Sequence, residues 1–420
     1  VVDSVFIRDS HGEDVDAAFF NANNDEFSDL YVAKGGNEFF AKMEPLKDCL
    51  YFGVGKGKFV KSQSALPDIY ANSACVKPAD IENDGDMDLF IGTRSVPREY
   101  GVIPKSFILI NDGTGHYTDQ TTVYAPALSE TGMVTDALWL DLNKDSLKDL
   151  VVVGEWMPIR IFYNSADVLT EVTDQYGLQN TTGWWNTLVS GDLNNDGHSD
   201  LVIGNLGLNS FLKTSITQPV QLYIDDFSGN NKLEQILTYY NGSKEYPLAS
   251  RDLMIENIPF LQEKYPTYAD YAGEAIDDIF TKDQLQSATL RQVVEFASVV
   301  MINNGNETFT KNTLPIEAQF SPNYSLLIDD INNDGFQDLI TGGNFSGVPP
   351  DLGRYDASFG EIFLGDGQGS FTSLNFHTSG FVVNGEIRQI KKIKNPNNQD
   401  RILVARNNHT VAIFNRLKNK

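Results

Sequence analysis

One stretch of the sequence decides the fold: Asp80-Ile-Glu82-Asn-Asp84-Gly85-Asp86-Met-Asp88-Leu-Phe-Ile-Gly92. Here an acidic, glycine-containing loop runs directly into a short apolar strand. Three other stretches repeat this order of residue types closely, namely Asp141 to Gly154, Asp192 to Gly204 and Asp330 to Gly342. A unit that recurs in this way predicts a repeat architecture, in which each copy forms one supersecondary unit.

Three weaker copies extend the series. Asn21 to Asp29 precedes Leu-Tyr-Val, and Asp226 to Glu234 precedes Ile-Leu-Thr. The third, Asn395 to Asp400, keeps the shape of the loop but little of its charge. Counting all of these loops predicts seven units.

A second element follows most copies: an apolar strand, a Gly/Asn turn and an aromatic residue that opens another strand. Ile108 to Tyr117 and Ile362 to Phe371 are examples. Asn-Gly and Asp-Gly pairs predict tight hairpins, so each unit reads as four short strands, like a propeller blade. We therefore expect an all-β, seven-bladed β-propeller spanning residues 1–420, with six or eight blades left open. The first residues, Val1 to Arg8, are expected to close the ring as a strand against Thr410 to Asn415.

The segment of residues 244–292 interrupts the fifth unit and is predicted to be a helical insertion. Thr281-Lys-Asp-Gln284 has the form of a capping box, which marks a helix start. Pro259 and Pro266 should break the segment into short helices. A lid packed over the propeller and a partner-binding surface both remain open.

Composition narrows the function. A formal charge of −25 excludes a general affinity for nucleic acid or anionic membranes. No apolar run approaches the roughly 18 residues of a membrane-spanning helix, so no direct span is expected. The two cysteines, Cys49 and Cys75, are compatible with one bridge or with two separate thiols.

The acidic loops predict calcium, which takes six to eight oxygen ligands in flexible geometry. Positions 1, 3, 5 and 9 offer side-chain oxygens and position 7 a backbone carbonyl. Position 12 is Ile91, Val152, Ile203 or Thr341 in place of the glutamate of an EF-hand, which excludes that motif. We expect several structural calcium ions, with the two looser loops left open and no ion at Asn395 to Asp400. The predicted ligands are Asp80, Glu82, Asp84, Asp86 and Asp88; Asp141, Asn143, Asp145, Leu147 and Asp149; Asp192, Asn194, Asp196, His198 and Asp200; Asp330, Asn332, Asp334, Phe336 and Asp338; and, for the looser loops, Asn21, Asn23, Asp25 and Asp29, and Asp226, Ser228, Asn230 and Glu234.

In these loops and strands the chain resembles the FG-GAP/VCBS repeat propellers, whose blades are related to the integrin α-subunit head. It is similar above all to a group common in Bacteroidota surface proteins that often accompanies ASPIC/UnbV-type sequences. The stretches similar to that group are 35–39, 154–158, 182–186, 204–209 and 353–357. The resemblance implies a place outside the cytoplasm, at the cell surface, in an outer-membrane complex or surface lipoprotein, or in the periplasm.

A ligand face is expected opposite the calcium loops, because all those loops should lie on one rim. The segments expected on that face contain the candidate ligand residues Arg94, Arg98, Trp156, Trp184, Trp185, Arg354 and Tyr355. The adjacent tryptophans suit stacking on sugar rings, and they equally suit filling the crowded end of a blade.

No catalytic residue is predicted, since the sequence has no nucleophile elbow, phosphate-binding loop or zinc-spaced histidines. We therefore expect a calcium-binding extracytoplasmic module for protein binding or assembly in the bacterial envelope, and we favour a binding role over an enzymatic one. The alternative is a glycan-binding module, or a polysaccharide lyase or hydrolase, with its site on the face opposite the calcium loops.

Overall fold

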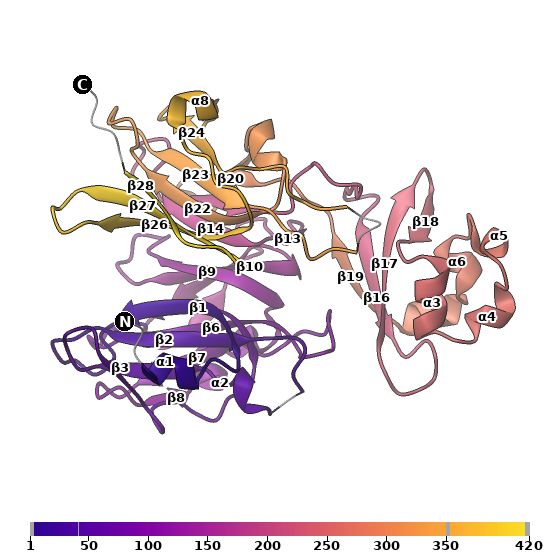
Figure 1. Cartoon of the computed structure of the whole chain (residues 1–420), viewed down its shortest axis with the longest axis horizontal. Coiled ribbons are helices and arrows are strands. Elements are labelled where there is room, and N and C mark those ends of the chain that lie inside the picture. The colour runs from indigo at the N-terminus through magenta and orange to yellow at the C-terminus, as the bar shows by residue number, and fades with distance from the viewer. Residues whose placement is uncertain (1–3, 41, 350–352, 416–420) are drawn as a thin grey trace.

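The computed structural model describes residues 4–40, 42–349 and 353–415. These residues form seven antiparallel sheets with short helices between some strands (Figure 1). Within the described ranges, no helix has the length and apolar character needed to cross a membrane. The chain is all-β in class and its fold is propeller-like.

Six sheets follow one another along the chain and are called the first to sixth sheets. The first sheet contains β1 (Glu13–Phe20), β2 (Asp29–Gly35), β3 (Cys49–Gly53) and β4 (Phe59–Lys61), and the second contains β5 (Asn72–Ala79), β6 (Asp88–Ser95), β7 (Phe107–Asn111) and β8 (Tyr117–Asp119). The third sheet contains β9 (Met133–Leu140), β10 (Asp149–Met157), β11 (Arg160–Asn164) and β12 (Leu169–Glu171), with β13 (Gly183–Trp184) beside β10, and the fourth contains β14 (Thr187–Gly191), β15 (Asp200–Gly204), β20 (Val299–Asn303) and β21 (Phe309–Thr313). The fifth sheet contains β22 (Asn323–Asp329), β23 (Asp338–Gly343), β24 (Glu361–Gly365) and β25 (Phe371–Leu374), and the sixth contains β26 (Ile387–Lys394), β27 (Asp400–Arg406) and β28 (Ala412–Asn415).

Successive sheets pack face to face, and the first strand of each lies beside the first strand of the next. Their apolar side chains form one core layer at each junction. Leu89 lies between the first and second sheets, Phe162 between the second and third, and Phe363 between the fourth and fifth. Alternation along each strand directs every other side chain into such a layer, which is how blades of a propeller bury both faces.

The predicted ring of seven blades requires correction. The fifth predicted unit forms a separate inserted sheet, with the order β18 (Lys244–Pro247), β17 (Glu234–Asn241), β16 (Val220–Asp225) and β19 (Thr289–Val293). This sheet enters the chain between β15 and β20, which pair with each other in the fourth sheet. The fourth sheet packs directly on the fifth through β14 and β22, so the inserted sheet does not lie between them.

The helical part of the insertion covers its own sheet. Its helices are α3 (Arg251–Asn257), α4 (Leu261–Lys264), α5 (Tyr268–Tyr271), α6 (Ile276–Ile279) and α7 (Lys282–Ser287). Their apolar side chains pack with Ile236 of β17 and with Phe227 of the loop between β16 and β17. The capping box is present, because Thr281 Oγ1 accepts the Gln284 N–H. Sheet and helices together project from one side of the molecule (Figure 1).

The N-terminal segment differs from its prediction as a closing strand. Ser4–Arg8 forms helix α1, and Phe6 packs against Tyr51 and Phe59 of the first sheet at ring-centroid distances of 5.1 and 5.7 Å; Val1 to Asp3 lie outside the described residues. Cys49 and Cys75 are buried free thiols. The remaining short helices are η1 (Glu44–Leu46), α2 (Thr121–Tyr124), η2 (Pro126–Glu130), η3 (Ile316–Gln319) and α8 (Phe376–Ser379).

Candidate functional site

The acidic loops join the first and second strands of their sheets and share one local geometry. In the second sheet, the Asp80 carboxylate accepts the N–H groups of Asp84 at 3.0 Å and Gly85 at 3.1 Å. Asp141, Asp192 and Asp330 hold their loops in the same way. Gly85 has φ +98°, a conformation that favours glycine and permits the sharp turn.

In five of the loops position 9 is an aspartate that is buried beneath the loop. Asp88 is fully buried, and its carboxylate accepts the N–H of Ile81 in the loop and the N–H of Asn111 at the end of the third strand, both at 2.9 Å. Burial raises the pKa of Asp88 to about 7. The equivalent residues Asp29, Asp149, Asp200 and Asp338 are buried and bonded in the same way.

The loop of the second sheet fits a cation best. Asp86 Oδ1 is buried and has no hydrogen-bond partner. Burial, and then the neighbouring carboxylates of Asp84, Glu82 and Asp80, raise the pKa of Asp86 to about 6. An unpartnered oxygen among mutually repelling carboxylates suits calcium, which prefers hard oxygen ligands. In the first sheet, Asn21 Oδ1 is a second such oxygen.

The other loops offer fewer charged ligands. Among the described residues, no three His, Cys, Asp or Glu side chains already form a group that holds a metal. Asn143 and Asn194 instead donate their amides to the position-5 carboxylates, at 2.9 and 2.8 Å. An ion in these loops would therefore need asparagine and backbone oxygens as well as carboxylates.

At the opposite ends of the second and third sheets lies an aromatic–charged cluster of Arg94, Tyr100, Glu155, Trp156 and Trp184. Arg94 Nη2 lies 2.5 Å from Glu155 Oε1, and Tyr100 donates to Oε2 at 2.7 Å. Trp156 Nε1 donates to Tyr100 Oη at 2.9 Å, and its ring meets that of Trp184 edge-on at 5.2 Å. The Glu155 carboxylate raises the pKa of Arg94, whose side chain is still 49% exposed. The cluster thus joins three of the predicted ligand residues around a half-buried ion pair.

The other predicted ligand residues lie elsewhere. Trp185 is fully buried between the third and fourth sheets and donates Nε1 to Thr181 O at 3.0 Å, so it belongs to the core and is removed from the candidate ligand site. Arg98 stacks on Phe40 at 4.6 Å. Tyr355 packs at the edge of the core layer that holds Trp156 and Trp184, and its Oη lies 3.0 Å from Ser210 Oγ.

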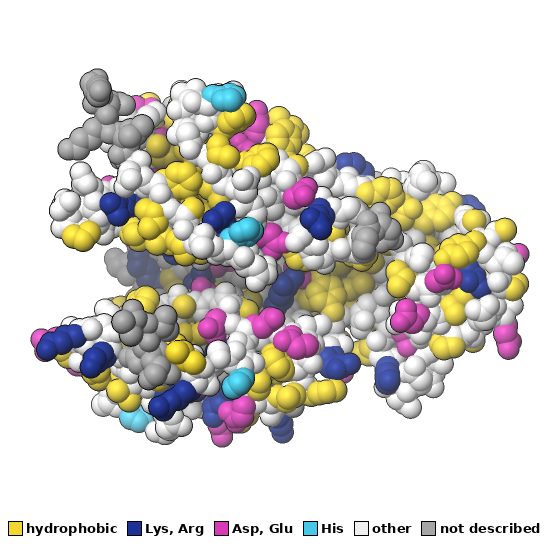
Figure 2. Space-filling model, in the orientation of Figure 1, with side chains coloured by type: hydrophobic (Ala, Val, Ile, Leu, Met, Phe, Trp, Pro, Cys, Tyr) yellow, Lys and Arg dark blue, Asp and Glu magenta, His cyan; other side chains and the backbone are white. Residues whose placement is uncertain are grey.

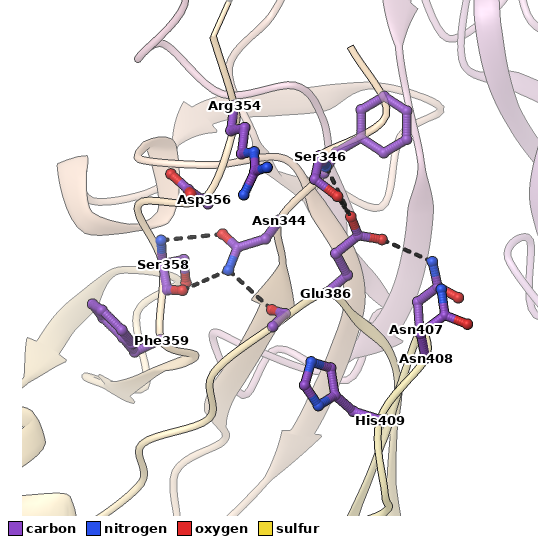
Figure 3. A pocket seen from close by; sticks show the side chains of 12 residues that line it. Asn344, Ser346, Arg354, Asp356, Ser358, Phe359, Glu386, Asn407, Asn408 and His409 are labelled. Atoms are coloured by element: carbon purple, nitrogen blue, oxygen red, sulfur yellow. Dashed lines mark hydrogen bonds between the residues drawn. The ribbon is translucent and has the colours of Figure 1, made fainter. Parts of the chain in front are cut away.

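Arg354 lines a separate pocket of about 490 Å³ between the connections of the fifth and sixth sheets (Figure 3). Asn344 shapes its floor: Oδ1 accepts the Ser358 N–H at 3.1 Å, and Nδ2 donates to the carbonyls of Ser358 and Gly385. Burial acts to raise the pKa of Glu386, but hydrogen bonds from Ser346 Oγ, Asn407 Nδ2 and Ser346 N lower it below its usual value. Arg354, Asp356 and His409 complete the lining, together with Phe345, Phe359 and Asn408.

Sequence reasoning missed Glu155, Tyr100, Asn344 and Glu386. Only Asn344 carries a local signal, since it follows two glycines and has φ +80°, which asparagine tolerates better than most residues. The other three acquire their roles only through contacts between different sheets.

Comparison with known proteins supports the repeat assignment. The FG-GAP-like repeat family matches residues 21–91 and 141–203. Over 163 residues, which are 37% of this chain and 14% of the relative, the sequence is 25% identical to integrin alpha-8 of Gallus gallus. The match therefore spans only a small part of that relative.

Solved structures give weaker likenesses. An Agrocybe aegerita lectin that recognises non-reducing terminal N-acetylglucosamine is 13% identical, with 87% of this chain and 83% of that chain covered and a TM-score of 0.34. BBS1N, solved in complex with ARL6DN, is 10% identical, with 96% and 91% covered and a TM-score of 0.37. The V. cholerae biofilm matrix protein Bap1 is 9% identical, with 96% and 87% covered and a TM-score of 0.31. These TM-scores are too low to carry an argument.

Proposed function

Since this chain belongs to the FG-GAP repeat proteins, we propose that it is a calcium-stabilised propeller that binds a protein partner outside the cytoplasm. The observation that carries the partner face is the unit of inserted sheet and helices. It projects from the body of six sheets and exposes apolar side chains, among them Phe211 and Ile216 on the segment that leads into it (Figure 2). Exposed apolar groups gathered on a projecting unit are typical of protein-interaction surfaces.

Calcium is proposed as a structural cofactor of the acidic loops. The second-sheet loop supports this best, through the unpartnered Asp86 Oδ1 and the adjacent carboxylates. Bound calcium would offset the repulsion between these carboxylates and hold the turn between the first two strands. Because the ion binds the folded loop, it would add to the free energy of unfolding.

An extracytoplasmic location is proposed on two grounds. Extracellular calcium modules work at about 10⁻⁴–10⁻³ M calcium, which the cytosol does not supply. The second ground is the partial match to integrin alpha-8 of Gallus gallus. The finer proposal, from sequence resemblance, is a Bacteroidota envelope protein that is part of a surface lipoprotein or of an outer-membrane complex.

The partner face can be tested by site-specific photo-crosslinking on native envelopes. A photoreactive residue replaces Phe211 or Ile216, which are 62% and 75% exposed, and the matched control replaces Val123, which is 61% exposed beside the second sheet. We expect both test positions to capture the same envelope protein and Val123 to capture none. Equal capture from all three positions, or none from either test position, would contradict this partner face.

Glycan binding is the second candidate, and the Asn344–Arg354 pocket favours it. Amide, guanidinium and imidazole groups beside the exposed Phe359 ring match the hydroxyl, carboxylate and apolar faces of an acidic sugar. Glycan arrays with the wild type and Arg354→Ala would show a binder that the variant loses. Release of unsaturated oligosaccharides would instead point to the lyase alternative.

A further inference from the structure

The six successive sheets leave a groove between the first and the sixth (Figure 2). Ile390 and Phe414 of the sixth sheet pack toward the fifth sheet, so residues that alternate with them face the groove. Lys391, Leu403 and Ile413 are cross-strand neighbours on this groove face, and Ile413 is 51% exposed. The last sheet therefore presents an apolar face with a free lysine to the groove.

The first sheet presents a second apolar face. Ala18 and Phe20 pack toward the second sheet, so the neighbouring Phe19 faces the other way and is 67% exposed. The Phe19 ring lies 6.2 Å from that of Phe59 at a tilt of 50°, and Phe6 of α1 packs on Phe59 as well. Both walls of the groove thus resemble the faces that successive sheets bury against each other.

A repeated hydrogen bond joins successive sheets near the axis. In several first strands a β-bulge precedes a side chain that accepts a backbone N–H from the first strand of the next sheet. Asp16 accepts from Val76 at 3.0 Å, Asp136 from Leu188 at 3.1 Å, and Ser325 from Ile390 at 2.7 Å.

Gln389 follows the equivalent bulge in the sixth sheet, and its amide has no hydrogen-bond partner among the described residues. The corresponding N–H of the first sheet, that of Ala17, is already bound to its own Asp16 at 2.9 Å. The N–H of Ala137 in the third sheet is likewise bound to its own side-chain neighbour, Asp136. In the second sheet, the position that would accept this N–H is Cys75, whose sulfur is a weak acceptor. The Ala17 N–H of the first sheet is therefore already occupied and does not supply the donor that Gln389 Oε1 lacks.

Charge defines the missing partner further. Lys77 lies two residues after Cys75 and reaches across to Asp136 of the next sheet at 2.6 Å. Lys391 lies two residues after Gln389 and is exposed, with no acidic partner among the described residues. A sheet that continued the series would place an aspartate where Asp136 lies in the third sheet.

We propose that a further four-stranded sheet of the same repeat type fills this groove and is supplied by the same polypeptide outside residues 1–420. Its first strand donates a backbone N–H to Gln389 Oε1 and places an acidic side chain beside Lys391. Its two faces bury the exposed Ile413 on one side and Phe19 on the other.

The test is photo-crosslinking in the full-length natural polypeptide. A photoreactive residue replaces Ile413 or Phe19, and the control replaces Val123, which is as exposed but lies away from the groove. Mass spectrometry of the digest then identifies the captured peptide. We expect Ile413 and Phe19 to capture one common segment outside residues 1–420 that carries an acidic loop before an apolar strand, and Lys391→Glu to reduce the yield several-fold.

Four outcomes would overturn the proposal. Capture between Ile413 and the first sheet of the same molecule would show that the six sheets close on themselves. Capture of an isotopically distinguishable second copy would show a dimer interface, and capture of a different protein would show a partner site. Crosslinking from Val123 to the same segment would show that the reaction is not specific to the groove.

Discussion

Asn111 connects Asp88 to the neighbouring sheet: its backbone N–H donates to Asp88 Oδ1 at 2.9 Å, and its side chain donates to the carbonyl of Ala22 at 2.8 Å. Asn164 repeats this relationship one sheet further on, with its side chain donating to the carbonyl of Ile81 at 2.9 Å. The acidic loops of the first and second sheets are thus each tied to the third strand of their own sheet and to the next sheet. The loops are part of the packing between sheets as well as candidate ion sites.

This coupling predicts that Asn111→Ala destabilises the protein by about 1–3 kcal/mol, because the buried hydrogen bond to the carbonyl of Ala22 is lost. The matched control is Asn312→Ala, at an exposed position, with an expected change within about 0.5 kcal/mol. Chemical denaturation in EGTA measures both variants without a contribution from metal. Equal effects of the two substitutions would show that the Asn111 bridge contributes nothing.

The adjacent tryptophans should respond differently to the same substitution. Trp185→Phe removes a buried indole and its hydrogen bond to Thr181, and should cost about 2–4 kcal/mol. Trp184→Phe removes a buried N–H that has no partner, so stability should change by less than about 1 kcal/mol. Thermal or urea unfolding measures the stability of both variants. If Trp184→Phe loses more stability than Trp185→Phe, the assignment of Trp185 to the core is wrong.

The repeat could be predicted from the sequence because its signals are local. The acidic loop, the strand that follows it and the capping box at Thr281 each lie within a few residues, and each is present in the structure. The place of the Asp226 loop could not be predicted in this way. Its local pattern is that of the other loops. It lies in an inserted sheet because β15 pairs with β20, almost a hundred residues later in the chain.

The candidate ligand site could be predicted only in part, because some of its signals are local and others are contacts between sheets. Alternation along a strand indicates that Trp184 and Trp185 point to opposite sides, and the structure places one in the aromatic–charged cluster and the other in the core. Which tryptophan takes which place depends on the packing of the third sheet on the fourth. The pairing of Arg94 with Glu155 likewise joins two sheets, so no sequence pattern indicates it.

Asp48 should make stability depend on pH. It accepts hydrogen bonds from Lys34 N, Tyr31 Oη and Ser73 Oγ, and burial raises its pKa to about 6. Because the folded protein holds this proton more tightly than the unfolded chain, the contribution of Asp48 to stability is full below about pH 4. This contribution is lost as the pH rises through about 6, and the total loss in the free energy of unfolding is about 2–3 kcal/mol.

The measurement for Asp48 is urea unfolding of the wild type and Asp48→Asn between pH 4 and 7.5, in EGTA. Asparagine does not titrate, so the stability of the wild type relative to the variant should fall across this range. A difference that stays constant with pH would show that Asp48 is not protonated in the folded protein near pH 5. Asp167→Asn, at an exposed turn, controls for the general effect of removing a carboxylate.

Calcium should stabilise the folded chain through its acidic loops. At 100 times its dissociation constant, an ion that binds only the folded state adds about 2.7 kcal/mol per site, so Tm should rise by several degrees over the EGTA value. Asp84→Asn removes a charged ligand from the loop that holds the unpartnered Asp86 oxygen, and should lose part of this rise, whereas Asp167→Asn should keep all of it. Magnesium at the same concentration should give a smaller rise, because it demands stricter octahedral geometry. If Tm is the same in calcium and in EGTA, the loops are turns that satisfy their own backbone and the calcium proposal is wrong.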